Sequence, residues 1–187
     1  MRCPSRNIVL IGFASTGKST TGRIVASRLG WKFVDIDDVV EEIYRAETGH
    51  ELSRRDIFSR IGRDGFIDLE TRALHRLEQN RETVIATGGG TPISNINRAL
   101  VTNLGSVVYL NAGIKTIFNR MTHKGYPRYL GESPSLADLN HLWLERHTVY
   151  TKMADLVVDN TDKSPEETAH IITDRLLLGA ETTATSS

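Results

Sequence analysis

Short apolar runs alternate with longer segments in which apolar residues recur at helical spacing. The apolar runs are Asn7–Ile11, Lys32–Asp35, Thr83–Thr87, Ser106–Leu110 and Leu156–Asp159. They are short and several are rich in β-branched residues, which is typical of strands buried on both faces of a parallel sheet. The alternation therefore predicts an α/β fold in which helices cover a parallel sheet.

The segments between these runs predict helices. They are Gly17–Leu29, Asp37–Thr48, Ser53–Ile61, Asp64–Glu78, Asn95–Leu104, Gly113–Thr122 and Ser135–Met153, and a last helix begins at Ser164–Pro165. Two regions interrupt the rhythm. The helical stretch from Asp37 to Glu78 is too long for one crossover, and His123–Pro134, with two glycines and two prolines, predicts a lid.

Length and charge place limits on the function. A chain of 187 residues with 39% hydrophobic residues predicts one domain, at 1–179, followed by a polar tail at 180–187 that we expect to be disordered. The 23 basic and 23 acidic side chains cancel, so we expect neither nucleic acid nor a membrane as a partner. A single cysteine and no long apolar run favour a reducing, cytoplasmic compartment. We also expect a monomer.

The clearest chemical motif is Gly12–Phe13–Ala14–Ser15–Thr16–Gly17–Lys18–Ser19, a full match to G-x-x-x-x-G-K-[ST] between a predicted strand and a predicted helix. Glycines let successive N–H groups point at phosphate oxygens, and the helix N-terminus adds positive potential. In this setting Lys18 would reach the β- and γ-phosphates of a nucleotide, and the Ser19 hydroxyl would ligate Mg²⁺. The motif predicts a site for ATP and Mg²⁺.

A second acidic element is needed to distinguish kinases from other nucleotide-binding proteins, and Asp35–Ile36–Asp37 is the candidate. Residues two apart on a strand share a face, so both carboxylates can point at the nucleotide. In one interpretation Asp35 orients water on Mg²⁺ and Asp37 accepts the proton of an attacking hydroxyl. In the other, Asp37 or Asp38 only caps the following helix.

Three consecutive glycines, Gly88, Gly89 and Gly90, follow the third predicted strand. Ligands bind at the carboxyl edge of a parallel sheet, and glycine lets a ligand approach the main chain closely. We therefore expect these glycines to form the base of a substrate-binding site. A flexible turn is the alternative. The pair Arg54–Arg55 is interpreted as a solvated helix face without function.

Together these elements resemble the shikimate kinase family over nearly the whole chain. The resemblance rests on Gly12 to Thr20, Asp35-x-Asp37, Gly65–Phe66, Gly88–Gly89–Gly90, Val107–Leu110, Arg146-x-x-x-Tyr150, and Val158–Thr161 before Pro165. It implies a three-layer α/β/α P-loop kinase with a five-stranded parallel sheet, an acceptor-binding subdomain at about 37–65 and a lid at about 122–134. It also implies transfer of the ATP γ-phosphoryl group to a hydroxyl of shikimate, a step of chorismate and aromatic amino acid biosynthesis.

The resemblance also implies residue roles. ATP would be bound by Ser15, Thr16, Gly17, Lys18, Ser19 and Thr20, with Arg120 and Pro165 beside the adenine. The acceptor would face Asp37, Gly88, Gly89, Gly90 and Arg146, and the metal would be held at Ser19 and Asp35. Arg128, in the predicted lid, would stabilise charge in the transition state, or it is a solvated lid residue.

Two positions depart from the family pattern. Ile67 stands where family members usually carry an arginine that binds the shikimate carboxylate, and Tyr126 stands where the lid usually carries an arginine. A charge-assisted arginine contact is worth ~1.5–3 kcal/mol, so losing one predicts about ten- to a hundredfold weaker binding. Arg60, Arg63 and Arg128 are the candidates for compensation. Two alternatives therefore stand beside shikimate phosphorylation: a kinase for another small hydroxylated metabolite, and a nucleotide- or metabolite-binding regulatory module without turnover.

Overall fold

The computed structural model describes residues 7–124, 126 and 134–184, with the main chain alone at 124 and 177–184. Its centre is a five-stranded parallel sheet with the strand order β2-β3-β1-β4-β5. The strands are β1 (Asn7–Ile11), β2 (Lys32–Asp35), β3 (Thr83–Ala86), β4 (Gly105–Asn111) and β5 (Leu156–Asp159). The predicted parallel α/β fold and all five strands are confirmed.

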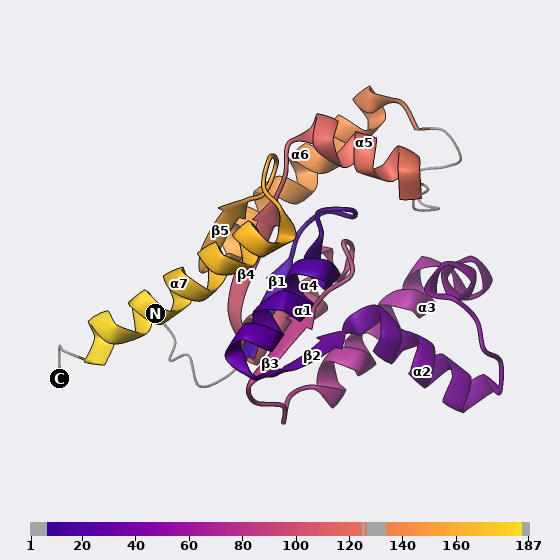
Figure 1. Cartoon of the computed structure of the whole chain (residues 1–187). Helices are drawn as coiled ribbons and strands as arrows, with labels where there is room; N and C mark the ends of the chain where they lie inside the picture. Colours follow the sequence, from indigo (N-terminus) through magenta and orange to yellow (C-terminus); the bar gives the residue numbers. More distant parts are fainter. Residues whose placement is uncertain (1–6, 125, 127–133, 185–187) are drawn as a thin grey trace.

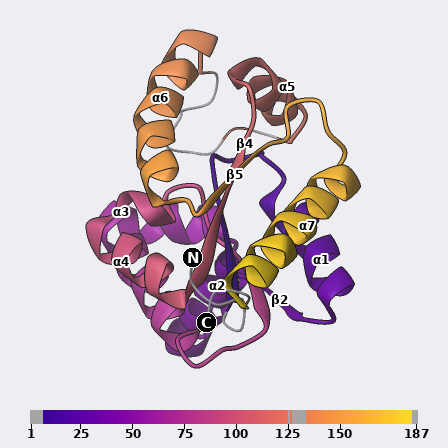
Figure 2. The same ribbon diagram turned by 90° about the vertical axis from the view of Figure 1, so that its left-hand side faces the viewer.

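Helices cover both faces of the sheet. They are α1 (Lys18–Leu29), α2 (Ile36–Thr48), α3 (Arg54–Arg76), α4 (Asn95–Leu104), α5 (Ile114–Lys124), α6 (Leu136–Met153) and α7 (Pro165–Ala184). Helices α1 and α7 lie on one side, and α3, α4 and α6 on the other (Figure 2). Helices α2 and α3 extend from one end of the sheet, while α5 and α6 rise from the other (Figure 1).

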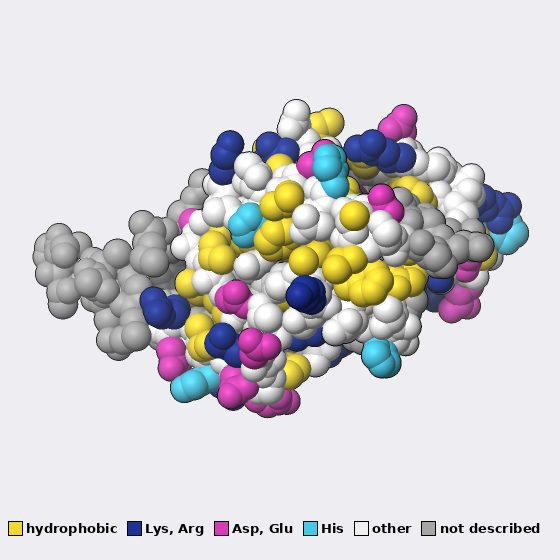
Figure 3. Space-filling view, turned by 90° about the horizontal axis from the view of Figure 1, so that it is seen from above, with side chains coloured by type: hydrophobic (Ala, Val, Ile, Leu, Met, Phe, Trp, Pro, Cys, Tyr) yellow, Lys and Arg dark blue, Asp and Glu magenta, His cyan; other side chains and the backbone are white. Residues whose placement is uncertain are grey.

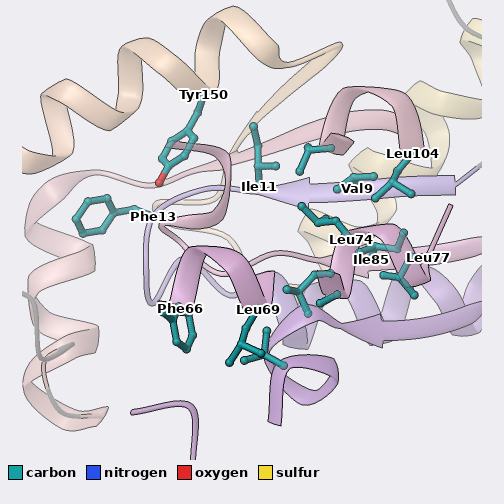
Figure 4. Close-up of a cluster of buried hydrophobic side chains, with 14 of the residues drawn as sticks. Val9, Ile11, Phe13, Phe66, Leu69, Leu74, Leu77, Ile85, Leu104 and Tyr150 are labelled. Atoms are coloured by element: carbon teal, nitrogen blue, oxygen red, sulfur yellow. The ribbon is translucent and has the colours of Figure 1, made fainter. Parts of the chain in front are cut away.

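The core divides into two clusters because successive side chains of a strand point to opposite faces. Ile8 and Leu10 of β1 pack beneath α1 and α7, whereas Val9 and Ile11 pack toward α3, α4 and α6. The cluster on the side of α3, α4 and α6 also contains Phe13, Tyr150 of α6 and Phe66 of α3 (Figure 4). Its side chains support the walls of the functional site described below.

Helix α3 is interrupted at Gly62, where φ is 71° and ψ is −174°. A positive φ of this size favours glycine, so the break occurs where the sequence permits it. The sequence predicted two helices, Ser53–Ile61 and Asp64–Glu78, and the break between them is confirmed.

The predicted disordered tail at 180–187 needs a correction. Helix α7 continues through 180–184 to Ala184, and residues 185–187 lie outside the described part of the chain. Alanine and glutamate are good helix formers, and extending an existing helix avoids the cost of nucleating a new one. None of the described helices combines the length and the apolar character that crossing a bilayer requires.

The Asn7 side chain links three segments of the chain at the amino-terminal edge of the sheet. This buried side chain donates to the carbonyls of Asn80 and Leu104, both at 3.0 Å, and accepts from the N–H of Thr83 at 3.3 Å. We expect Asn7→Ala to lower the free energy of unfolding by about 2–4 kcal/mol, because it leaves buried main-chain groups unsatisfied. Denaturant unfolding measures this, and Asn103→Ala, at an exposed position of α4, is the control. Equal stability of the two variants would contradict the prediction.

Candidate active site

The loop from Gly12 to Gly17 joins β1 to α1 and curls back over the end of β4. Its backbone has φ 144° at Gly12, 62° at Ser15 and 90° at Gly17. A Cβ atom at residue 12 would lie 2.4 Å from the carbonyl oxygen of Leu110, so only glycine fits there. The motif read from the sequence thus forms a loop at the amino terminus of α1, the arrangement that binds phosphate.

Lys18 is buried beneath this loop. Its Nζ donates to the carbonyl oxygens of Gly12 at 3.0 Å and Phe13 at 2.9 Å. Burial lowers the pKa of Lys18 to about 8, although the nearby Asp37 carboxylate opposes this shift. These two carbonyl oxygens hold the Lys18 ammonium group close to the loop. A phosphate oxygen bound in the loop could replace them as the hydrogen-bond acceptor.

Ser19 and Asp35 form the predicted metal-binding pair. The Ser19 hydroxyl donates to Asp35 Oδ2 at 2.6 Å, across the gap between α1 and β2. A hydroxyl and a carboxylate are hard oxygen donors, and Mg²⁺ in kinases typically takes only one or two protein ligands beside phosphates and water. The pair therefore fits Mg²⁺. The described residues contain no group of three or more His, Cys, Asp or Glu that could hold a metal by themselves.

The local structure around Asp37 differs from the strand geometry that the sequence suggested. Helix α2 already begins at Ile36, so Asp37 lies in its first turn, and Asp35 is the N-cap, accepting from the Asp37 N–H at 3.1 Å. The alternative in which Asp37 or Asp38 caps this helix is therefore wrong. Asp35 serves both as the cap and as the partner of Ser19, through its two different oxygens.

The Asp37 carboxylate has two different environments. Its Oδ2 is ion-paired with Arg54 of α3, while its Oδ1 is buried and has no hydrogen-bond partner among the described residues. Burial raises the pKa of Asp37, and the Arg54 guanidinium opposes this shift. A buried oxygen without a donor is costly, which marks Oδ1 as an acceptor for a ligand's hydroxyl.

The three glycines lie opposite Asp37 and differ in how closely other atoms surround them. A Cβ atom at Gly88 would come within 3.2 Å of Asp37 Oδ1 and 3.1 Å of Glu70 Oε1, and one at Gly89 would lie 3.0 Å from the N of Ala14. At Gly90 a Cβ atom would meet nothing within 4 Å. The glycine loop thus packs against the phosphate-binding loop on one side and opens at Gly90.

Helix α6 reaches the same loop. The Gly89 carbonyl accepts from Arg146 Nη1 at 3.4 Å and from the Tyr150 hydroxyl. The Arg146 guanidinium also lies over the Phe13 ring, 5.2 Å from its centroid. The predicted acceptor-side residues Asp37, Gly88–Gly90 and Arg146 are therefore brought together.

The other end of the phosphate-binding loop contacts the segment between β5 and α7. Asn160 Nδ2 donates to the carbonyl of Thr16 at 2.6 Å, and Arg120 Nη2 donates to the carbonyl of Asn160 at 3.2 Å. This network brings Arg120 and the segment before Pro165 to one side of the loop. The sequence places Asn160 in the stretch Val158–Thr161 but does not show that its buried side chain holds the phosphate-binding loop.

A cleft of about 950 Å³ joins the two halves of the site. The phosphate-binding loop, Asp37 and the glycines line it, together with Arg54, Arg55, Phe58, Arg63, Ile67, Glu70, Tyr126 and Arg146. Of the candidates for compensation, Arg63 lines the cleft, Arg60 is not among its lining residues, and Arg128 lies outside the described residues.

Sequence reasoning missed two charged residues of α3. Arg54, interpreted as part of a solvated face, contacts Asp37 and lines the cleft. Glu70 is buried, and its Oε1 accepts from the Thr91 hydroxyl at 2.5 Å. Burial raises the pKa of Glu70 to about 7. Neither residue belongs to a motif that would have identified it.

A strand-to-helix loop shaped for phosphates, a buried lysine and a carboxylate facing a small-molecule cleft occur together in P-loop kinases, and this fold and site define the chain as one. The family follows from comparison with known proteins: the model of the shikimate kinase family matches residues 14–177, so the chain belongs to that family and is an ATP-dependent kinase.

Individual relatives agree with this assignment. The chain is 38% identical to the shikimate kinase of Geobacter sulfurreducens, over 89% of this chain and 90% of the relative. It is 35% identical to that of Geobacter metallireducens, over 90% of each. Among solved structures it resembles the shikimate kinase from Acinetobacter baumannii in complex with shikimate, with a TM-score of 0.83, 28% identity and 94% of each chain covered.

The buried Glu70 should make stability depend on pH. Its proton is held more tightly in the folded than in the unfolded chain, so its contribution to the free energy of unfolding falls as the pH rises from about 4.5 to about 7. We expect the wild type to lose about 3 kcal/mol over this range relative to Glu70→Gln. Denaturant unfolding at a series of pH values measures the difference, with Glu166→Gln, at an exposed position of α7, as the control. Parallel curves for the wild type and Glu70→Gln would show that the carboxyl group is not so perturbed.

Proposed function

We propose that this protein transfers the γ-phosphoryl group of ATP to a hydroxyl of shikimate, forming shikimate 3-phosphate and ADP. The observation that carries the proposal is the buried, unpartnered Asp37 Oδ1, which faces the glycine loop in a cleft shared with the phosphate-binding loop. Membership of the shikimate kinase family and the likeness to a shikimate-bound structure support the choice of acceptor.

In this reaction the N–H groups of residues 15–20 hold the phosphates, with Arg120 and Pro165 beside the adenine. Lys18 moves from the carbonyls of Gly12 and Phe13 to the phosphate oxygens and neutralises charge there. Ser19 and Asp35 would hold Mg²⁺, which would neutralise charge at the phosphates. The buried side chains of Phe13 and Tyr150 form the apolar support behind the site.

The acceptor lies between Asp37 and the glycines. Asp37 Oδ1 accepts the proton of the attacking hydroxyl as that oxygen forms its bond to the γ-phosphorus and the bond from the phosphorus to the bridging oxygen of ADP breaks. The proton leaves Asp37 for solvent after product release. Arg146, fixed against Gly89 and Phe13, faces the acceptor from α6.

A second candidate is a kinase for another small hydroxylated metabolite. The observation that favours it is the apolar Ile67, which lines the cleft where the family usually provides a guanidinium. The predicted lid at about 122–134 and the role of Arg128 fall largely outside the described residues and stay predictions. A cytoplasmic monomer also stays a prediction.

The role of Asp37 is tested by Asp37→Asn. We expect shikimate-dependent ADP release to fall by about 10²- to 10⁴-fold, because the amide cannot accept the hydroxyl proton. Calorimetry should show that the variant still binds Mg·ATP. Lys18→Met is the complementary variant and should lose ATP binding itself. An Asp37→Asn enzyme with undiminished turnover would exclude this mechanism, and a wild type without turnover on any hydroxylated acceptor would favour the regulatory module.

The glycine loop offers a matched pair of variants. Gly90→Ala adds a methyl group where nothing lies within 4 Å and φ is −92°, so we expect unchanged stability. If the acceptor rests on this main chain, Gly90→Ala should raise the Kd for shikimate about tenfold or more, because the methyl group occupies the acceptor's space. Gly88→Ala, which crowds Asp37 and Glu70, should instead destabilise the fold. Unchanged shikimate affinity in Gly90→Ala would place the acceptor elsewhere in the cleft.

A further inference from the structure

The acceptor half of the cleft is rich in charged side chains of both signs. Its described lining includes the guanidinium groups of Arg54, Arg55, Arg63 and Arg146 and the carboxylates of Asp37, Glu41, Glu70 and Glu145. A cleft with this lining can bind a small molecule that carries both hydroxyl groups and an anionic group. On the face of the molecule seen from above, apolar side chains instead form a band with charged side chains on both sides of it (Figure 3).

Arg54 is the guanidinium that contacts the proposed catalytic carboxylate. It is the first residue of α3, and its backbone N–H donates to Glu41 Oε1 of α2 at 2.6 Å, which fixes its position on the acceptor-binding subdomain. Its side chain crosses to Asp37 Oδ2 and is about one third exposed, at 36%. The contact can therefore be reached by a molecule that enters the cleft.

The other charged groups at this end have defined positions. Arg146 lies against the Gly89 carbonyl and the Phe13 ring on the opposite wall, and Glu70 accepts from Thr91. Ile67 lines the cleft with an apolar side chain and offers no charge. Arg54 therefore stands on the α3 wall at the point where Asp37 meets the acceptor.

Guanidinium groups recognise carboxylates in particular, because their planar N–H donors match two carboxylate oxygens. The structure already has one carboxylate, that of Asp37, on this guanidinium. The carboxylate of an acceptor has the same chemistry, but unlike Asp37 it is not attached to α2 and can therefore move freely to the guanidinium. It can replace Asp37 as the partner of Arg54, and both Asp37 oxygens are then available to the acceptor hydroxyl.

We propose that Arg54 binds the carboxylate of the acceptor in exchange for Asp37, and so selects hydroxylated monocarboxylates over neutral polyols. The inference rests on the proposed function, since it requires an acceptor that faces Asp37. It assigns to Arg54 the role of a specificity-determining residue, which the apolar side chain at residue 67 cannot fill.

The test is a cycle that combines a change in the enzyme with a change in the acceptor. The kcat/KM values of the wild type and Arg54→Leu are measured with shikimate and with its primary amide, which has a similar shape but no charge. We expect the wild type to prefer shikimate by about 10- to 100-fold, the effect of one charge-assisted contact. Arg54→Leu should lose a similar factor with shikimate and little with the amide, so that its preference nearly disappears.

Arg55→Leu is the matched control, because Arg55 is the next residue of α3 and lines the same cleft. It should keep the wild-type preference for the acid. Arg54→Lys keeps the charge without the planar fork and should keep part of the preference. Arg54→Gln replaces Arg54→Leu if the leucine variant does not fold, as judged by circular dichroism.

The outcomes separate this inference from the proposed function. Wild-type turnover of shikimate with equal losses on both acceptors in Arg54→Leu would mean that Arg54 serves Asp37 alone, and the inference would fail while the function stands. A wild type that does not distinguish the acid from the amide would overturn it as well. A wild type that phosphorylates neither acceptor would overturn the function and the inference together.

Discussion

The close approach of two main-chain segments at residue 12 is the constraint on which the rest of the site depends. The carbonyl of Leu110 lies where any side chain at residue 12 would begin, so the chain leaves β1 in a conformation available to glycine and turns back over β4. This turn directs the carbonyls of Gly12 and Phe13 toward Lys18 and positions the amino terminus of α1 beneath the loop. Ser19, one residue further, then reaches Asp35 on the neighbouring part of the sheet edge.

The charged groups of the site form a network in which each compensates another. Lys18 and Glu70 are buried and Asp37 is partly buried, and in each case burial shifts the pKa in the direction that favours the neutral form. Arg54 and Arg146 approach from two helices that are far apart in the sequence. Opposite charges therefore lie close together in the cleft. A charged ligand that binds there replaces one ion pair by another, and no isolated, hydrated charge has to lose its water.

Much of this arrangement could be predicted from the sequence, because its elements are local. The strand before Gly12, the helix after Gly17 and the stop at Gly62 follow from short patterns whose physical meaning does not depend on the rest of the chain. The sequence identified Asp35 and Asp37 as a pair at the end of a strand, but it offered Asp37 or Asp38 as the cap of α2. Asp35 is the cap because the helix begins at Ile36, one residue before the predicted start.

Arg54 shows why the remainder could not be predicted. Arg54 and Arg55 are adjacent and chemically identical, and both lie in the first turn of an exposed helix. Only the packing of α3 on α2, anchored by the hydrogen bond from the Arg54 N–H to Glu41, decides which side chain turns toward Asp37. Glu70 likewise appears as one of many helical glutamates until the fold brings Thr91 and Gly88 against it.

The interruption of α3 at Gly62 has a consequence for how such an enzyme changes over evolutionary time. Each side of the glycine carries both kinds of residue: Ile57 before it and Leu74 after it are buried in the core, while Arg54 before it and Ile67 after it line the cleft. The buried side chains hold each half of α3 in place, whatever side chains face the cleft. Mutations can therefore accumulate on the acceptor wall and redirect the enzyme to new metabolites while the catalytic scaffold is inherited unchanged.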